Sequence, residues 1–207
     1  MDRRWERLHV AEQGQGPPVL LVHGQPGVGA DWDLVADRLA RDHRVLVPDR
    51  PGYGASTPEP LGMAENSELL AELLVAKGSA PATVVGHSYG GGVSVLLAHR
   101  HPELVRGLVL VGSVGNEASV NGFDHVLALP VLGEVLSALG LMTVGRVLPR
   151  LRPFANLLPD TAATRLRASL PDPRYAAGVS RQGLRVYRAF VAEQRSLIAE
   201  VGDVERA

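Results

Sequence analysis

The stretch from Ala82 to Gly92 most constrains how this chain can fold; it reads Ala-Thr-Val-Val-Gly-His-Ser-Tyr-Gly-Gly-Gly. Its first, mostly β-branched positions are typical of a buried strand, and Tyr89–His99 has the composition of a helix. The turn between them, Gly86–Gly90, matches the pattern G-x-S-x-G. A serine on such a turn adopts a strained backbone conformation that exposes its hydroxyl, and the flanking glycines let strand and helix cross closely. We therefore expect Ser88 at a strand-to-helix corner.

The same five residues also fit a glycine-rich turn without a catalytic role. The choice between the two interpretations therefore depends on the rest of the sequence. Apolar runs of strand length occur at Val19–Val22, Arg44–Val47 and Gly107–Val111, and Thr83–Val85 precedes the turn. Helical spacing of apolar residues occurs in two segments between them, Asp31–Arg41 and Ala64–Ala76. Strands that alternate with helices indicate an α/β fold, with a mostly parallel twisted sheet flanked by helices on both faces.

The ends of the chain have a different pattern. Trp5–Glu12 alternates loosely and predicts a first strand. After about Gly115 the sequence shows helical segments without a buried strand, interrupted by prolines. The helical segments expected there are Phe123–Leu139, Leu151–Leu158, Thr161–Leu170 and Leu184–Val201. We predict a core over residues 1–115 and a helical cap over residues 116–207.

Composition excludes several classes of protein. The net charge of −1 over 207 residues gives no basis for a nucleic-acid or anionic-membrane partner. The absence of cysteine excludes disulfides, thiolate metal sites and cysteine nucleophiles. The most apolar region, Val126–Leu148, is broken by glycine and charged residues, so no membrane span is expected. The N-terminus is charged and leads into no apolar signal core, so we expect a cytoplasmic protein.

Three motifs that each follow an expected strand carry a family resemblance. They are His23-Gly24-Gln25-Pro26-Gly27, Asp49-Arg50-Pro51-Gly52-Tyr53-Gly54 and Gly86-His87-Ser88-Tyr89-Gly90. In order and spacing the chain resembles the α/β-hydrolase superfamily, in its capped esterase, epoxide-hydrolase and haloperoxidase-like branch. The resemblance is close over Leu8–Val114, and the helical stretch that follows is similar in size and placement to the family's cap.

The resemblance implies roles for individual residues. Ser88 would be the nucleophile, and the backbone N–H groups of Gln25 and Tyr89 would form the oxyanion hole. Losing one such donor typically costs roughly 3–4 kcal/mol of barrier. No metal and no organic cofactor is implied. The residues that would support the motifs are His23, Gly24, Gly86, His87 and Gly90, and Asp49 with Gly52–Gly54 would shape a turn near the site.

The identity of the nucleophile narrows the chemistry. Relatives that open epoxides or displace halide carry Asp at the elbow, whereas this chain has Ser88. Ser88 implies acyl transfer, in which a small apolar ester, thioester or lactone is cleaved. Hydrolysis of a carbon–carbon bond is possible with the same catalytic groups. His23 is expected to fix its loop rather than act as a base, and His87 to have a packing role.

The chain departs from the family pattern after the serine. A serine needs a base and an orienting acid, which in this family follow the nucleophile in the order Asp or Glu, then His. The only histidine beyond the helix after Ser88 is His125, in the cap-like region, and Glu117 with His125 makes a poor candidate dyad. The sequence predicts that the final core strands, with the catalytic acid and base, are missing from a C-terminally truncated chain.

This departure leaves alternatives to an active serine hydrolase. The chain would be inactive alone, would bind a small ligand without cleaving it, or would be a subunit completed by another chain or a second copy. Gly107–Val111 would then be an exposed sheet edge, which makes the isolated chain prone to aggregation.

Overall fold

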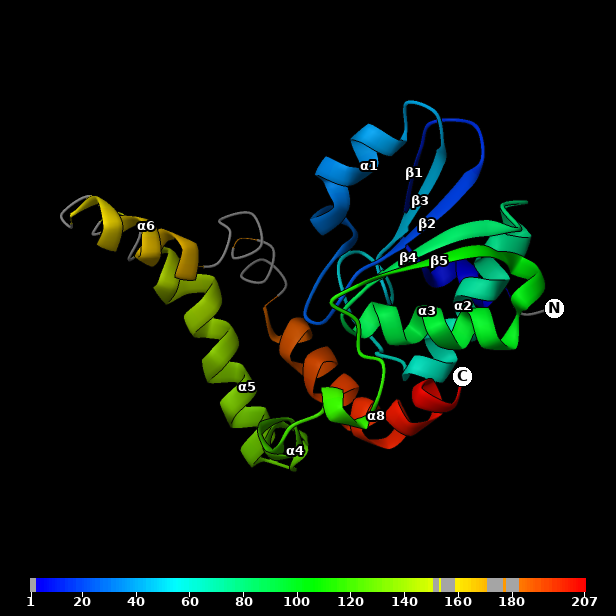
Figure 1. Cartoon of the computed structure of the whole chain (residues 1–207). Helices are drawn as coiled ribbons and strands as arrows, with labels where there is room; N and C mark the ends of the chain where they lie inside the picture. The colour runs from blue at the N-terminus through cyan, green and yellow to red at the C-terminus, as the bar shows by residue number, and fades with distance from the viewer. Residues whose placement is uncertain (1–2, 151–152, 154–158, 171–176, 178–182) are drawn as a thin grey trace.

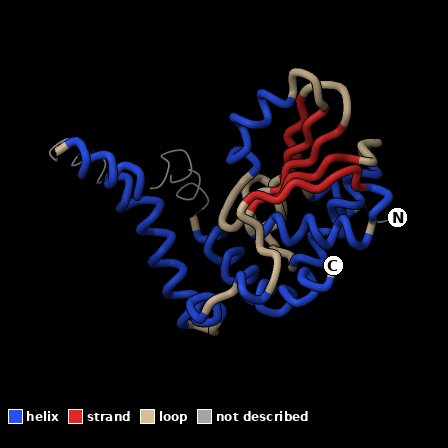
Figure 2. The backbone as a smooth tube through the Cα atoms, viewed as in Figure 1, coloured by secondary structure: helices blue, strands red, loops and turns tan. Residues whose placement is uncertain are grey.

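The fold is built on one five-stranded sheet in the order β1-β3-β2-β4-β5 (Figures 1 and 2). The computed structural model describes residues 3–150, 153, 159–170, 177 and 183–207. The strands are β1 (Val10–Gln13), β2 (Pro18–Val22), β3 (Arg44–Pro48), β4 (Ala82–His87) and β5 (Val105–Val111). β2 pairs in parallel with β3 and β4, and β4 pairs in parallel with β5. Only β1 runs antiparallel, with Val10 opposite Pro48. The expected mostly parallel α/β sheet is confirmed.

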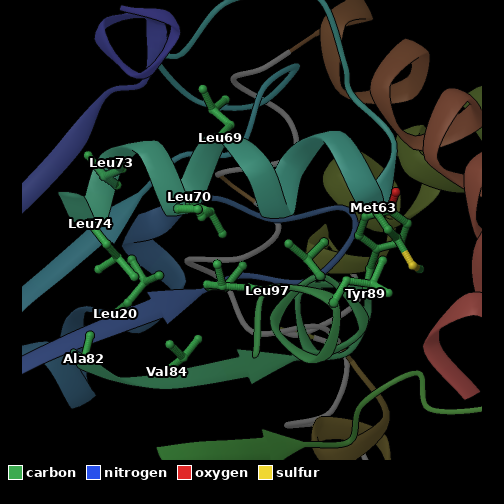
Figure 3. Close-up of a cluster of buried hydrophobic side chains, with 14 of the residues drawn as sticks. Leu20, Met63, Leu69, Leu70, Leu73, Leu74, Ala82, Val84, Tyr89 and Leu97 are labelled. Atoms are coloured by element: carbon green, nitrogen blue, oxygen red, sulfur yellow. The ribbon is translucent and has the colours of Figure 1, made fainter. Parts of the chain in front are cut away.

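Helices cover both faces of the sheet, as the continuous apolar strands predict. Successive residues of a strand point to opposite faces. Leu20 and Val22 of β2 join a buried cluster with α2 (Met63–Ala76) and α3 (Tyr89–Arg100), part of which Figure 3 shows. Val19 and Leu21 point to the other face, toward α1 (Asp33–Leu39), which follows the 3-10 turn η2 (Gly29–Trp32).

The first predicted strand is partly wrong. The segment begins as a 3-10 turn, η1 (Arg4–Arg7), and pairing with β3 starts only at Val10. Two contacts hold this turn on α2: Arg4 Nε donates to Glu72 Oε1 at 2.9 Å, and the Trp5 ring packs against the core cluster. Burial of one aromatic ring therefore outweighs the weak alternation of the sequence.

The helix predicted over Phe123–Leu139 is two helices. α4 (Gly122–Ala128) ends before Pro130, and α5 (Leu132–Met142) begins after it. Leu129 is extended at ψ 139°, because the ring of a following proline disfavours the helical conformation. The short turn η4 (Glu117–Ser119) precedes α4.

Among the residues that the structure describes, the second half also contains α6 (Asp160–Ser169) and α8 (Leu184–Arg206), close to the predicted segments. The helix expected over Leu151–Leu158 falls on residues outside the described ranges. α5 continues into a π-helical turn, η5 (Thr143–Val147). Within the part that the structure describes, the run Leu132–Arg150 is long and apolar enough to cross a membrane, by length and composition only. One such run is a weak indication, so the absence of a membrane partner stays a prediction.

α8 packs on the core rather than only on the other helices of the second half. Leu197, Val201 and Val204 of α8 belong to the main core cluster. The C-terminal part of α8 accordingly lies against α3 (Figure 1). Two of its polar side chains also cap α2: the Met63 N–H donates to Ser196 Oγ at 3.1 Å and the Ala64 N–H to Glu200 Oε2 at 2.7 Å. The boundary predicted near residue 115 therefore crosses extensive contacts, and the division into core and cap stays a prediction.

Candidate active site

Ser88 lies at the corner where β4 ends and α3 begins. Its backbone has φ 52° and ψ −120°, a region that residues with a side chain rarely adopt. Hydrogen bonds on both sides fix this corner: the Ser88 N–H donates to Val111 O at 3.1 Å, and its carbonyl accepts from Gly91 N at 2.9 Å and Val114 N at 3.1 Å. The side chain is half-buried. The strain expected from the sequence is thus present and is held in place by β5 and α3.

Two motif glycines let the elements cross closely at this corner. A Cβ on Gly86 would stand 2.6 Å from Gly91 Cα, and a Cβ on Gly90 would stand 2.5 Å from Val22 O. Both distances are far shorter than any carbon contact, so a larger residue at either position would push α3 away from the sheet. The glycines therefore set how tightly the serine corner packs against β2.

The His-Gly loop after β2 lies against the serine. A Cβ on Gly24 would stand 3.0 Å from Ser88 Cβ and 2.9 Å from His87 Nδ1. Gln25 follows directly, and its side-chain amide Nε2 donates to Gln194 Oε1 on α8. The Tyr89 ring is buried, with its hydroxyl 3.0 Å from Ser196 Oγ. The oxyanion role predicted for Gln25 and Tyr89 concerns their backbone N–H groups, and it stays a prediction.

His23 has the bonding pattern of a histidine that fixes a loop. It is buried; Nδ1 donates to Gly24 O at 2.9 Å, and Nε2 accepts from the Arg50 N–H at 2.9 Å. Burial, with the nearby Arg50 cation adding to it, holds the pKa of His23 well below its ordinary value. Both ring nitrogens are engaged in a neutral ring, so His23 is not available as a general base.

Among the described residues, neither of the other histidine candidates is hydrogen-bonded to Ser88. His87 is exposed and packs edge-on against the Trp32 ring, with 6.4 Å between ring centroids. Glu117 and His125, the candidate dyad, are both exposed on η4 and α4. Over the described ranges, no hydrogen bond joins the Ser88 hydroxyl to a histidine or a carboxylate. The described residues thus supply a serine and a loop beside it, without a base in place.

Sequence reasoning missed the residue that ties the site together, Arg50. The second motif was expected to shape a turn, and Asp49 does so by accepting the N–H groups of Gly29 at 2.7 Å and Ala55 at 2.9 Å. Arg50 is fully buried, and its guanidinium donates to His23 O and Gly24 O, both at 2.9 Å. A buried arginine needs a counter-charge, and the sequence offered no signal for which acid supplies it.

The counter-charge of Arg50 is Glu193 of α8. Both guanidinium nitrogens Nη1 and Nη2 contact this carboxylate, which is also fully buried and accepts the Tyr53 hydroxyl at 2.7 Å. Burial alone would lower the pKa of Arg50, and the adjacent Glu193 carboxylate holds it above its ordinary value. The Tyr53 and Tyr89 rings lie 5.2 Å and 4.8 Å from the guanidinium carbon, within cation–π range.

A separate cavity of about 530 Å³ lies between β1, η2 and α1. It is lined by residues such as His9, Asp33, Val47 and Arg185, and Ser88 is not among them. No cluster of three metal-binding side chains occurs in the described ranges. This cavity therefore does not belong to the serine site.

Comparisons with known proteins place this geometry in a family. The family model described as alpha/beta hydrolase fold matches residues 17–148. The chain is similar to 2-hydroxymuconate semialdehyde hydrolase of Pseudomonas sp. strain CF600, with 35% identity over 182 residues, covering 81% of this chain and 64% of that protein. It is also similar to the pimeloyl-[acyl-carrier protein] methyl ester esterase of Vibrio atlanticus, with 39% identity over 133 residues, covering 64% of this chain and 50% of that enzyme.

A solved structure agrees with the sequence relatives. A Pseudomonas aeruginosa protein proposed to be an epoxide hydrolase superposes with a TM-score of 0.71 at 27% identity, covering 96% of this chain and 69% of that one. The chain thus spans less than two thirds of the length of the two curated relatives named above. The motifs, the five-stranded sheet and these matches agree, and the chain belongs to the α/β-hydrolase fold family of enzymes.

Proposed function

We propose that this chain carries the nucleophile of a serine hydrolase. The enzyme would cleave an ester-like bond through an acyl-enzyme at Ser88. The observation that carries the proposal is the backbone of Ser88, at φ 52° and ψ −120°, on the corner between β4 and α3. Such strain persists only where the surroundings enforce it, and it is concentrated at functional sites. The nearness of Gly24 to Ser88 adds support, because it brings the loop of the first motif to the same point.

The proposed reaction begins when Ser88 Oγ attacks the acyl carbon and its proton passes to a base. The acyl oxygen then gains negative charge, which the N–H groups of Gln25 and Tyr89 would stabilise. Collapse of this intermediate breaks the bond to the leaving alcohol, which takes up the proton, and water then releases the acid by the reverse sequence. α3 also directs the positive end of its dipole at the site.

The base for this reaction is not supplied near Ser88 by the residues that the structure describes. His23 is neutral and fully engaged in hydrogen bonds, and His87 packs on Trp32. A serine without a base loses most of the rate of an intact triad, because the members of a triad act as a unit. The 207-residue chain alone is therefore expected to be nearly inactive, and a small base added in solution should restore part of the activity.

The substrate class follows from the nucleophile and from the relatives. A serine nucleophile favours acyl substrates over epoxides, for which the family resemblance implies an aspartate. One relative is named for a methyl ester on an acyl-carrier protein and another for 2-hydroxymuconate semialdehyde. Small apolar esters are the substrates we propose, and the semialdehyde is the second compound to assay.

The test is chemical rescue with imidazole. Hydrolysis of p-nitrophenyl acetate is measured for the full chain and for Ser88→Ala over a range of imidazole concentrations, so that direct hydrolysis by imidazole cancels. We expect the difference between the two proteins to grow with imidazole. Ser119→Ala, which removes an exposed hydroxyl on η4, is the matched control and should behave as the unmodified chain. Equal rates for the unmodified chain and Ser88→Ala would contradict the proposal.

A second candidate, a subunit completed by another chain, is favoured by β5. Val109, Leu110 and Val111 are 47%, 46% and 44% exposed, although consecutive strand residues face opposite sides of a sheet. A strand that is apolar on both faces is typical of a sheet interior, not of an edge. Isolation of the protein only as a stable complex with a chain that adds a histidine would favour this candidate. A stable monomer with imidazole-dependent activity would favour the first.

A further inference from the structure

Two consecutive residues of α8 are linked to the loop beside Ser88, Glu193 through Arg50 and Gln194 directly. Glu193 pairs with Arg50, whose guanidinium holds the carbonyls of His23 and Gly24. Gln194 accepts from the side-chain amide of Gln25. These residues are separated by more than 140 positions in the sequence, so their contact is a feature of the folded chain. α8 is therefore linked to the His-Gly loop indirectly through the Arg50–Glu193 ion pair and directly through the side-chain amide of Gln194.

The hydrogen bonds to the Gly24 carbonyl fix the orientation of the Gly24–Gln25 peptide as well as its position. The Gly24 carbonyl accepts from Arg50 Nη2 and from His23 Nδ1, both at 2.9 Å. The peptide bond between Gly24 and Gln25 is not among the cis bonds of the chain, and a trans peptide is planar with its C=O and N–H pointing in opposite directions. Two donors on the Gly24 oxygen therefore aim the Gln25 N–H away from Arg50.

The same segment of α8 is also bonded to the helices of the second half. Gln194 Nε2 donates to Asp124 Oδ1 of α4 at 3.1 Å, and Arg195 Nε donates to Ala128 O at 3.1 Å. Arg195 also pairs with Glu134 of α5 at 3.2 Å. Residues 193–195 thus connect α4 and α5 on one side with the loop beside Ser88 on the other.

We propose that Glu193 and Gln194 are positioning residues, which hold the Gly24–Gln25 peptide in the orientation that an oxyanion hole requires. Glu193 acts through Arg50, and Gln194 acts through the Gln25 side chain. Neither residue touches a reacting group. The consequence for catalysis rests on the function proposed above, whereas the consequence for the loop does not.

The experiment compares Glu193→Gln with Glu200→Gln in the full chain. Both changes neutralise a glutamate of α8, but Glu200 contacts the start of α2 instead of the loop. The readout is amide hydrogen exchange at two N–H groups next to the His-Gly loop. One is the Arg50 N–H, which donates to His23 Nε2, and the other is the Gly29 N–H, which donates to Asp49 Oδ1. We expect at least tenfold faster exchange at both in Glu193→Gln, and unchanged exchange in Glu200→Gln.

Activity and a second variant separate the possible outcomes. In imidazole, Glu193→Gln should lower kcat about tenfold with KM unchanged, since the orientation of a donor matters in the transition state. Gln194→Ala removes a loop contact without exposing a buried charge, so it decides the question if Glu193→Gln does not fold, and it should also accelerate exchange. Unchanged exchange in the folded variants would overturn the inference. Absence of any Ser88-dependent turnover would instead overturn the proposed function, with the exchange result still standing.

Discussion

Gly24 and Ser88 are in contact across the strand-helix corner: a methyl group on Gly24 would stand 3.0 Å from Ser88 Cβ. The same methyl group would stand 3.1 Å from His87 O. The loop after β2 and the turn after β4 therefore meet with no space for a side chain between them. This contact brings the first and third motifs, which lie more than 60 residues apart, to one point.

Gly24→Ala should reduce Ser88-dependent turnover by about 100-fold, the usual effect of losing one oxyanion donor. The added methyl group would displace the loop from Ser88 and carry the Gln25 N–H with it. The measurement is the imidazole-dependent hydrolysis of p-nitrophenyl acetate. Gly115→Ala, where a Cβ meets no atom within 4 Å, is the control and should keep full turnover. Equal turnover in both variants would show that the loop position does not matter.

Stability should fall as the pH falls below about 6.5, because His23 is held neutral. In the unfolded chain its pKa is near 6.5, and in the folded chain burial and Arg50 hold it well below. The unfolded state then binds the extra proton, so the free energy of unfolding rises with pH by up to about 1.4 kcal/mol per pH unit in this window.

Urea unfolding between about pH 5 and pH 7 measures this slope. Glu12 and Glu68, whose pKa values are lowered by hydrogen bonds to basic side chains, lose their contributions at lower pH than this window. Burial raises the pKa values of Asp31 and Glu193, which gives a slope of the opposite sign, so the part of the slope that belongs to His23 is the difference between the unmodified chain and the His23 variant. His23→Gln should remove most of the slope. His125→Gln, which changes an exposed histidine, should leave the slope unchanged. The same slope in His23→Gln as in the unmodified chain would contradict the burial account.

The exposed edge of β5 should make the isolated chain self-associate. Val109→Lys places a charge on this edge, a common protection of natural edge strands, and should raise the monomer fraction in sedimentation velocity. Val75→Lys is the control, because Val75 is 63% exposed on α2 rather than on a sheet edge. If the unmodified chain stays monomeric at all concentrations and unfolds cooperatively, the edge does not drive association.

Ser196→Ala should lower the free energy of unfolding by about 1 kcal/mol, the usual cost of losing a helix cap. Ser196 Oγ accepts the Met63 N–H at the start of α2, although it belongs to α8. The change also removes the partner of the Tyr89 hydroxyl. Chemical denaturation measures the effect, and an unchanged stability would mean that water replaces the cap.

The parts of the fold that the sequence predicted are those that local patterns determine. β2, β3 and β4 were predicted because a strand buried on both faces is continuously apolar, as in Val19–Val22. The serine corner was predicted because only a few residue types fit its backbone. The break at Pro130 is also visible in the sequence, because a proline disfavours the helical conformation of the residue before it.

What the sequence could not predict depends on contacts between distant segments. The Arg50–Glu193 pair joins residues 143 positions apart, and Glu193 stands in a helix whose pattern indicates only amphipathicity. Many acids follow Arg50 in the chain, and nothing local distinguishes the one that becomes buried with it. The same holds for the capping of α2 by α8, because the capping residues belong to a different helix.

The most direct test of the central claim is to treat the chain with a fluorophosphonate in imidazole buffer and locate the adduct by peptide mass spectrometry. We expect one adduct per chain, on Ser88, and none in Ser88→Ala. An adduct on another residue, or equal labelling of the two proteins, would contradict the assignment of Ser88 as the nucleophile.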